Sequence, residues 1–376
     1  MSTTFPHPFL PSLLPLLALG TFASVLGCAV PTVDASDVDA NADEPTSNVE
    51  DGDDASRFGS VSEAITGGSP VPTSSLFDHT TVSFGFCTGT IIGPRHVLGA
   101  AHCRHAANDV VQFYEGSRII PNLSRTVKTV YMPYGVDPSR LPQRGFLSEF
   151  ANWDQGMTDS EGKFADLVVL ELDAAIPWPA EIATLASTYL GNAPVGSMVG
   201  QGNHDGNANP TMELRWTTSK VYSSNDADGH MLTDSSDVNP GDSGGPFYTL
   251  AGRTPVVHGV LHGMRWEWAK RAKYTSVSFH VSRILRAMGD VRLGGDLVYD
   301  VPGSTVRREA NVDACAASCL QTTTCNGYSF DGNTSTCTRH PSVAGVWPRR
   351  RAGVKSGYRR AAGTGSCDLV GGECRI

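Results

Sequence analysis

A serine between glycines is the first candidate for chemistry in this chain. Residues 239–246 read Asn-Pro-Gly-Asp-Ser-Gly-Gly-Pro, so Gly241 and Gly244 enclose Asp242 and Ser243. Glycine tolerates backbone angles that other residues resist, and such a turn presents the Ser243 hydroxyl without a side chain blocking the approach. The turn can also direct the amides of Gly241 and Ser243 at one point, where an oxyanion would form. The run predicts a serine nucleophile with its own oxyanion hole.

A serine hydroxyl is a poor nucleophile and needs a base and an orienting acid. His102 lies upstream after two alanines, and Asp166 precedes the apolar run 167–170. A carboxylate that leads into a buried strand is costly unless it is hydrogen-bonded. Donation from a histidine ring satisfies it and fixes the tautomer of the ring. We therefore expect Ser243 to attack, His102 to act as base and then acid, and Asp166 to orient His102.

The order His, Asp, Ser is the one that chymotrypsin-like enzymes use. Residues 65 to about 290 resemble the trypsin/chymotrypsin-like serine proteases, and the matching pieces are residues 65–68, residues 87–92, the His102 and Asp166 motifs, and residues 241–246. A glycine-rich serine turn alone is a weak signal, whereas four ordered motifs are a strong one. The resemblance implies peptide-bond hydrolysis through an acyl-enzyme and an all-β domain of two six-stranded antiparallel β-barrels with a C-terminal helix. Short strands with Gly/Pro turns, and apolar residues at three- and four-residue steps over 277–288, favour the same architecture.

The resemblance also assigns substrate preference. The residue six before the nucleophile is Asp237, which would lie at the bottom of the primary specificity pocket and favour a substrate Arg or Lys. Three departures bear on this assignment. Asn239 stands where the family often has cysteine, residues 261–264 read Leu-His-Gly-Met where the pocket wall usually begins Ser-Trp-Gly, and Ala272 stands where glycine is common.

Residues 65–68 look like the new N-terminus that activates this family. The freed amino group of Ile65 would pair with the carboxylate of Asp242 and set the oxyanion hole, because a buried, unpaired Asp242 would be costly. Glu63 and Ala64 stand where family zymogens usually carry Arg or Lys. Either a protease with another preference cleaves here, or activation differs; a strand start without cleavage also stays open.

Composition and the N-terminus indicate export. The formal net charge of −9 argues against a nucleic-acid partner, and residues 34–54 hold nine Asp or Glu and no Lys or Arg, as in a disordered linker. A short apolar stretch ends in Val-Leu-Gly-Cys28, which resembles a bacterial lipobox. The resemblance implies a secreted or cell-envelope lipoprotein that is tethered to the membrane through Cys28. Residues 1–10 carry no Lys or Arg, and an ordinary signal with a chance cysteine stays open.

The chain has nine cysteines, and setting Cys28 aside leaves an even number, suited to an exported disulfide protein. Cys87 and Cys103 match the family's bridge beside the catalytic histidine. The other six lie further on: Cys315, Cys319, Cys325, Cys337, Cys367 and Cys374. The first four resemble a PAN/apple module, a small disulfide-rich α+β domain that binds protein or carbohydrate. Three connectivities are possible for these four, and zinc is the weaker alternative; we expect the last two to pair in the tail.

These observations predict a domain order. Residues 1–28 form a signal and lipobox segment, 29–64 an acidic linker and propeptide, 65–290 the protease domain, 291–308 a linker or first strand, 309–360 the PAN/apple-like domain and 361–376 a tail. We expect a monomer with a protein or peptide substrate, no cofactor and no metal, since His204 and Asp205 in one loop are weak evidence for a metal site. Glu171 is interpreted as a surface charge.

Overall fold

A computed structural model describes residues 65, 67–140, 155–202, 212–225, 227–235, 237–265, 271–360, 368–370 and 373–376. The predictions for residues 1–64, with Cys28 among them, for His204 and Asp205, and for Cys367 lie outside this part of the chain. Of Cys374 the backbone alone is described. No helix among the described residues is both long and apolar enough to cross a membrane.

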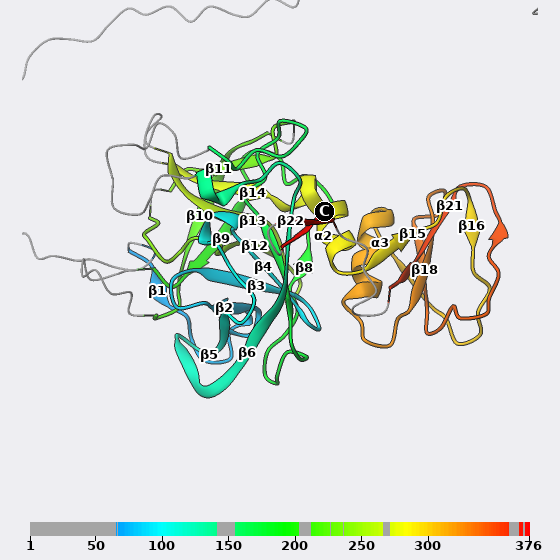
Figure 1. The fold of residues 1–376 in the computed structure, drawn as a ribbon, viewed down its shortest axis with the longest axis horizontal. Coiled ribbons are helices and arrows are strands. Elements are labelled where there is room, and N and C mark those ends of the chain that lie inside the picture. The colour runs from blue at the N-terminus through cyan, green and yellow to red at the C-terminus, as the bar shows by residue number, and fades with distance from the viewer. Residues whose placement is uncertain are drawn as a thin grey trace, which may run out of the picture. The chain divides into compact units, whose positions relative to one another are not determined.

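Six strands close a first β-barrel, and Figure 1 labels five of them, β2 to β6. They are β2 (Thr81–Ser83), β3 (Thr88–Gly93), β4 (His96–Gly99), β5 (Val110–Glu115), β6 (Arg118–Met132) and β7 (Val168–Leu172). Neighbours pair in the order β6, β5, β2, β3, β4, β7, and β7 pairs back to β6. Every pair is antiparallel. Val82, Ile91, Phe113 and Leu170 are among the buried side chains of this barrel's core, which is the burial that alternating apolar strands predict.

A second barrel follows the same plan. Its strands are β9 (Val195–Gly200), β10 (Arg215–Asn225), β11 (His230–Thr233), β12 (Pro246–Ala251), β13 (Thr254–Arg265) and β14 (Arg271–Ser276). They pair in the order β10, β11, β14, β13, β12, β9, and β9 pairs back to β10. The short strands β1 (Ser69–Pro70) and β8 (Thr184–Leu185) add to β10 and β13. The expectation of two closed six-stranded antiparallel barrels is confirmed.

The helix expected after the second barrel is α2 (Val277–Ala287). Its N-cap is Ser276, whose hydroxyl oxygen accepts the amide of Phe279 at 3.4 Å, as a capping serine does. Val277, Val281, Ile284 and Leu285 form its buried face. A short helix, α1 (Leu76–Thr80), precedes β2 and begins at the capping residue Ser75.

A separate five-stranded sheet forms after α2. Its strands are β15 (Asp290–Arg292), β17 (Thr305–Arg308), β18 (Gly327–Asp331), β19 (Thr336–His340) and β21 (Val354–Arg359), in the order β15, β21, β18, β19, β17. A second pair joins β16 (Leu297–Val298) to β20 (Arg349–Arg350). The stretch 291–308, expected to be a linker or a first strand, contains β16, β17 and two residues of β15. All four residues of β17 are exposed at the sheet edge, so no apolar alternation marks it in the sequence.

Two disulfides hold the helix of this region, α3 (Val312–Leu320), to its surroundings. Of the three possible connectivities, the structure has Cys315–Cys337 and Cys319–Cys325. Arg359 closes the end of α3, because its guanidinium donates to the carbonyl oxygens of Cys319 at 2.7 Å and Leu320 at 2.6 Å. These are backbone acceptors that a helix end leaves unsatisfied.

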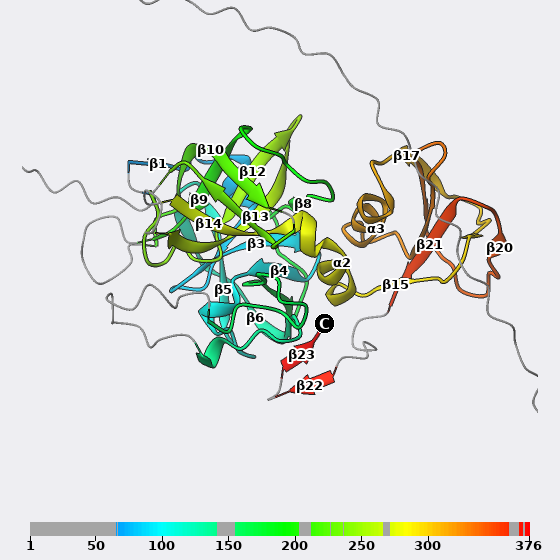
Figure 2. The same ribbon diagram turned by 90° about the horizontal axis from the view of Figure 1, so that it is seen from above.

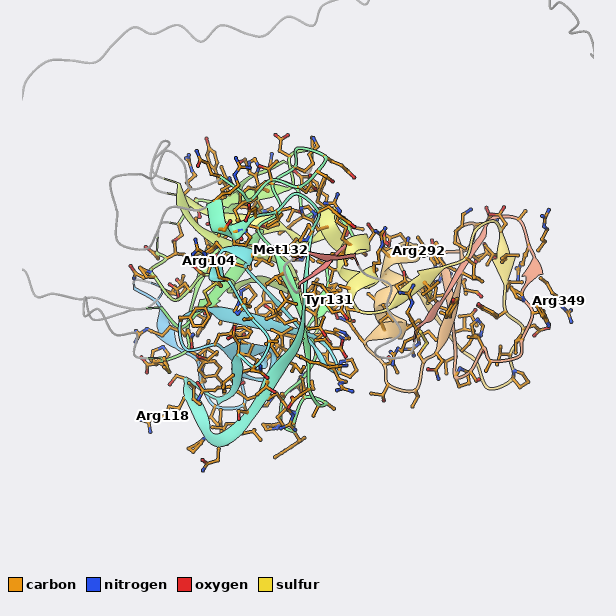
Figure 3. The ribbon with its side chains drawn as sticks, in the orientation of Figure 1. Arg104, Arg118, Tyr131, Met132, Arg292 and Arg349 are labelled. Atoms are coloured by element: carbon orange, nitrogen blue, oxygen red, sulfur yellow. A yellow bond between two sulfur atoms is a disulfide. The ribbon has the colours of Figure 1, made fainter. Side chains whose placement is uncertain are left out.

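The C-terminal residues return to the first barrel. After β22 (Asp368–Val370), β23 (Glu373–Arg375) runs parallel to β6, with Cys374 opposite Tyr131 and Arg375 opposite Met132 (Figures 2 and 3). The amide of Ile376 donates to the carbonyl of Met132 at 3.0 Å. The α3 region also bonds to the protease region, since the Gln321 side chain donates to two backbone carbonyls there.

One acidic residue of β7 corrects a sequence expectation. Glu171 is buried rather than on the surface. Its carboxylate oxygens accept from the Lys128 ammonium at 3.1 Å and the Tyr131 hydroxyl at 3.0 Å. Both partners come from β6, which the sequence separates from Glu171 by about forty residues, so the pairing follows from barrel closure.

Candidate active site

The serine turn has the backbone that its glycines permit. Gly241 and Gly244 have φ of +107° and +82°, values that residues with a Cβ resist. A Cβ on Gly244 would lie 2.2 Å from the carbonyl oxygen of Thr88. Thr88 also holds the turn directly, because its amide donates to the Ser243 carbonyl at 2.8 Å and its hydroxyl to the Gly241 carbonyl at 2.9 Å. A strand of the first barrel thus fixes a turn of the second.

The amides of this turn divide into two groups. Those of Asp242, Gly244 and Gly245 donate to backbone carbonyls at 2.8–3.0 Å. Among the described residues no acceptor is found for the amides of Gly241 and Ser243. Two unsatisfied amides two residues apart, on a turn whose other amides are engaged, are what an oxyanion hole requires.

His102 lies in a 3₁₀ turn, Ala101–Cys103, directly after β4. The turn ends at Arg104 (labelled in Figure 3), which is left-handed with φ 56°. The Cys87–Cys103 disulfide ties the turn to the residue before β3. Such a bridge closes a loop of about fifteen residues and is worth about 3 kcal/mol in the chain-entropy account. Cys103 Sγ lies 4.0 Å from the Ser243 carbonyl oxygen, so the segments that carry His102 and Ser243 are adjacent.

Asp166 is fully buried just before β7 and bonds His102 through both carboxylate oxygens. Its Oδ1 accepts the His102 amide at 2.9 Å, and its Oδ2 accepts the His102 Nδ1–H at 2.6 Å. Because an ionised carboxylate only accepts, Nδ1 must carry the proton and Nε2 is left as the basic nitrogen. Thr275 of β14 donates to the Asp166 carbonyl at 2.9 Å. The structure thus joins His102 to Asp166 in the orientation that a general base needs.

A second imidazole on Asp166 was missed by the sequence reasoning. His262 of β13 donates through Nδ1 to the same Oδ2. Burial acts to raise the pKa of Asp166, but the electrostatic attraction of the His102 and His262 rings and the hydrogen bonds that they donate outweigh it and hold the pKa well below its usual range. The sequence treated His262 only as a replacement in the pocket wall. The available signal was a histidine between apolar residues and glycine in a strand, since burial obliges such a ring to find a hydrogen-bond partner.

Asp242, beside Ser243, is fully buried, and its carboxylate contacts Ile65. Its Oδ2 accepts the Asn239 amide at 2.8 Å and the Ile65 amide at 3.4 Å, and its Oδ1 accepts the Gly202 amide at 2.7 Å. Burial outweighs these three bonds and raises the pKa of Asp242 to about 6. Ile65 is 1% exposed and has φ 41°, a strained value for a β-branched residue.

Asp237 precedes the serine turn and is half-buried. Its Oδ2 accepts the Ser235 hydroxyl at 2.8 Å, and its own amide donates to that hydroxyl at 3.1 Å. Ala272 is fully buried on β14 and bonds the Ser235 carbonyl through its amide. Two of the residues that the sequence assigned to the pocket, Asp237 and Ala272, therefore meet at Ser235.

Two groups of three side chains in the described part of the chain bring metal-type ligand atoms within 4.8 Å of one another. One is Cys87, His102 and Cys103, whose sulfurs form a disulfide and offer no thiolate. The other is His102, Asp166 and His262, in which both Nδ1 atoms direct protons at the carboxylate. The donor set fits a proton-transfer network better than a metal centre, since metal ligands must be deprotonated.

The match to a known family covers the part of the chain that holds these residues. A family model described as Trypsin matches residues 65–287, which is more than half of the chain. A search of curated proteins finds no match. The matched range begins at Ile65, includes His102, Asp166 and Ser243, and ends with α2. The chain belongs to the trypsin family.

Proposed function

We propose that this protein is an exported serine endopeptidase that hydrolyses peptide bonds through an acyl-enzyme. The observation that carries the proposal is the double hydrogen bond from His102 to Asp166, next to a serine turn with two unsatisfied amides. A binding protein has no need of a buried, ionised carboxylate aimed at an imidazole beside a serine, because that arrangement costs stability.

The proposed reaction has two halves. The Ser243 hydroxyl attacks the peptide carbonyl while His102 Nε2 takes its proton, and the amides of Gly241 and Ser243 stabilise the oxyanion. His102 then protonates the leaving amine as the C–N bond breaks, and the acyl-enzyme forms. Water attacks the ester with His102 again as base, and the Ser243–acyl bond breaks to release the acid. Asp166 keeps the tautomer of His102 throughout.

Asp237 supports a preference for Arg or Lys before the cut. Its carboxylate is half-buried beside Ser235, and a partly desolvated carboxylate pairs well with a guanidinium or an ammonium. The three disulfides support an oxidising, extracytoplasmic compartment. We further propose that the region after α2 docks the protease to a protein or carbohydrate, and that Cys28 carries a lipid.

Freeing the amino group of Ile65 is expected to raise kcat roughly 10²- to 10³-fold, the value of an ordered oxyanion-hole donor. In the intact chain Ile65 offers Asp242 a neutral amide, and the pKa of Asp242 is raised to about 6. A raised pKa gives stability that is present at low pH and lost as pH rises through about 6. In the cleaved protein, the ammonium of Ile65 would pair with the ionised carboxylate of Asp242, so this loss of stability should not occur. The unfolding free energy of the cleaved protein should therefore exceed that of the intact protein by more at pH 7 than at pH 5.

This prediction is checked with a cleavage site introduced before Ile65. The intact protein, the cleaved protein and a cleaved protein acetylated at Ile65 are compared for kcat and for unfolding free energy at pH 5 and pH 7. The acetylated form should behave as the intact one. Equal activity in all three would show that the family's activation pair does not operate here.

The proposed function itself is tested by covalent labelling. A fluorophosphonate should phosphonylate Ser243 of the Ile65-cleaved protein with loss of fluoride, and peptide mass mapping locates the adduct. The same experiment uses peptidyl phosphonates with a basic or an apolar side chain before the reactive phosphorus. Faster labelling by the basic reagent would support a preference for Arg or Lys at the Asp237 pocket. Absence of label on the cleaved, folded protein would favour the alternative, a catalytically inert surface adhesion protein with a protease-like domain.

A further inference from the structure

One carboxylate oxygen of Asp166 accepts hydrogen bonds from two imidazole rings. His102 and His262 come from different barrels, and both direct Nδ1 at Oδ2. The two rings meet edge to face, with centroids 5.2 Å apart and planes at 86°. The backbone amide of His102 takes Oδ1. Asp166 is thus held by three donors, and only one of them comes from outside the His102 segment.

The ring of His262 is buried and packs against an aromatic neighbour. The ring is 3% exposed and also meets Phe164 edge to face, with centroids 5.1 Å apart. The ammonium of Lys273 lies over the same phenyl ring, 3.6 Å from the Phe164 centroid. Among the residues that the structure describes, Asp166, His102 and Lys273 are charged or titratable groups that act on His262. Burial outweighs the attraction of Asp166 and lowers the pKa of His262, so the ring is neutral.

We propose, building on the proposed function, that His262 is a positioning residue that fixes the carboxylate plane of Asp166 and moderates its pull on His102. Because Oδ2 also accepts a hydrogen bond from the neutral His262 ring, its hydrogen bond with His102 is weaker than it would be if His102 were its only donor. It also prevents the carboxylate from rotating about its Cβ–Cγ bond, because Oδ2 is held from two directions. His262 is buried and is not placed to contact the reacting atoms. Its effect on the substrate is therefore transmitted through His102.

The test compares His262→Leu, which removes the donor, with His262→Asn, whose side-chain amide can donate from the position of Nδ1. We expect kcat of the leucine variant to fall roughly 10- to 100-fold, the cost of a small misplacement of a catalytic group, with KM changed less than about twofold. The midpoint of the acidic limb of kcat/KM should rise by roughly 0.4 to 1 pH unit, because His102 gains the whole acceptor strength of Oδ2. His262→Asn should recover most of both changes.

A matched control uses the same strand. His258→Leu removes a half-buried ring that bonds Thr249 and not Asp166, and it should leave the acidic limb unmoved. If the leucine variant at 262 does not fold, His262→Phe fills the space beside Phe164 without a donor and replaces it. Leucine or phenylalanine variants that fold and keep the wild-type kcat and acidic midpoint would overturn the proposal.

A second readout separates this proposal from the proposed function. The imidazole titration of His102 is followed by NMR in a Ser243→Ala background, with and without His262→Leu, where no turnover is needed. A higher midpoint in the leucine variant supports the role of His262 even if the wild-type protein hydrolyses nothing. An unchanged midpoint in an otherwise active enzyme would overturn the positioning role and leave the proposed function standing.

Discussion

Replacing Ser243 with alanine is expected to lower kcat for a peptide substrate by about 10⁶, as loss of the nucleophile does in serine proteases. In the proposed reaction the hydroxyl oxygen of Ser243 forms the acyl bond, and no other group of the turn can replace it. The turn should keep its shape, because the bonds from Thr88 use the backbone of Ser243 and Gly241 rather than the hydroxyl. KM should therefore change little, while kcat is lost almost completely.

The matched control removes a different hydroxyl from the same barrel. Ser276→Ala deletes the N-cap of α2 and should cost about 1 kcal/mol of unfolding free energy with kcat retained. Both variants are measured with the cleaved protein and one peptide library. Peptide cleavage that persists at the wild-type rate in Ser243→Ala, after contaminating proteases are excluded by repurification, would contradict the acyl-enzyme proposal.

Local motifs made much of the site predictable. The glycines at 241 and 244 predict a turn with positive φ, and both residues have positive φ in the structure. Asp166 stands directly before an apolar strand, where only a hydrogen-bond donor makes burial tolerable, and it bonds His102. Short apolar strands between Gly/Pro turns indicate an all-β barrel fold, while the number of barrels and strands came from the resemblance to the family. In each case the signal lies within a few residues of the feature that it predicts.

Contacts that depend on strand register were not predictable in the same way. The pairing of β13 with β14 shifts between Leu261 and Gly263, and such a bulge changes which face the next side chain occupies. His262 lies at that shift and reaches Asp166, although the sequence offers it only as part of a pocket wall. Glu171 shows the same limit, since its partners on β6 come into reach only when β7 closes the barrel.

Replacing Asp166 with asparagine is expected to lower kcat by about 10⁴, which corresponds to about 5.4 kcal/mol of transition-state stabilisation. Oδ2 accepts protons from His102 and from His262. An amide nitrogen at that position would face two N–H donors, so His102 would turn to the tautomer whose Nδ1 accepts. Its Nε2 would then carry a proton and could not take one from Ser243. The pH–rate profile and kcat of the cleaved variant measure this.

Asp159→Asn is the matched control, because it makes the same exchange at another buried carboxylate in the segment before β7. Asp159 Oδ1 accepts the amides of Glu161 at 2.9 Å and Lys163 at 2.8 Å, and its Oδ2 is paired with Arg283. Loss of that pair should reduce unfolding free energy and leave kcat within about twofold, since Asp159 does not orient an imidazole. If Asp166→Asn kept kcat within tenfold of the wild type, the tautomer of His102 would not be set by Asp166. The second imidazole on that carboxylate would then need a role apart from catalysis.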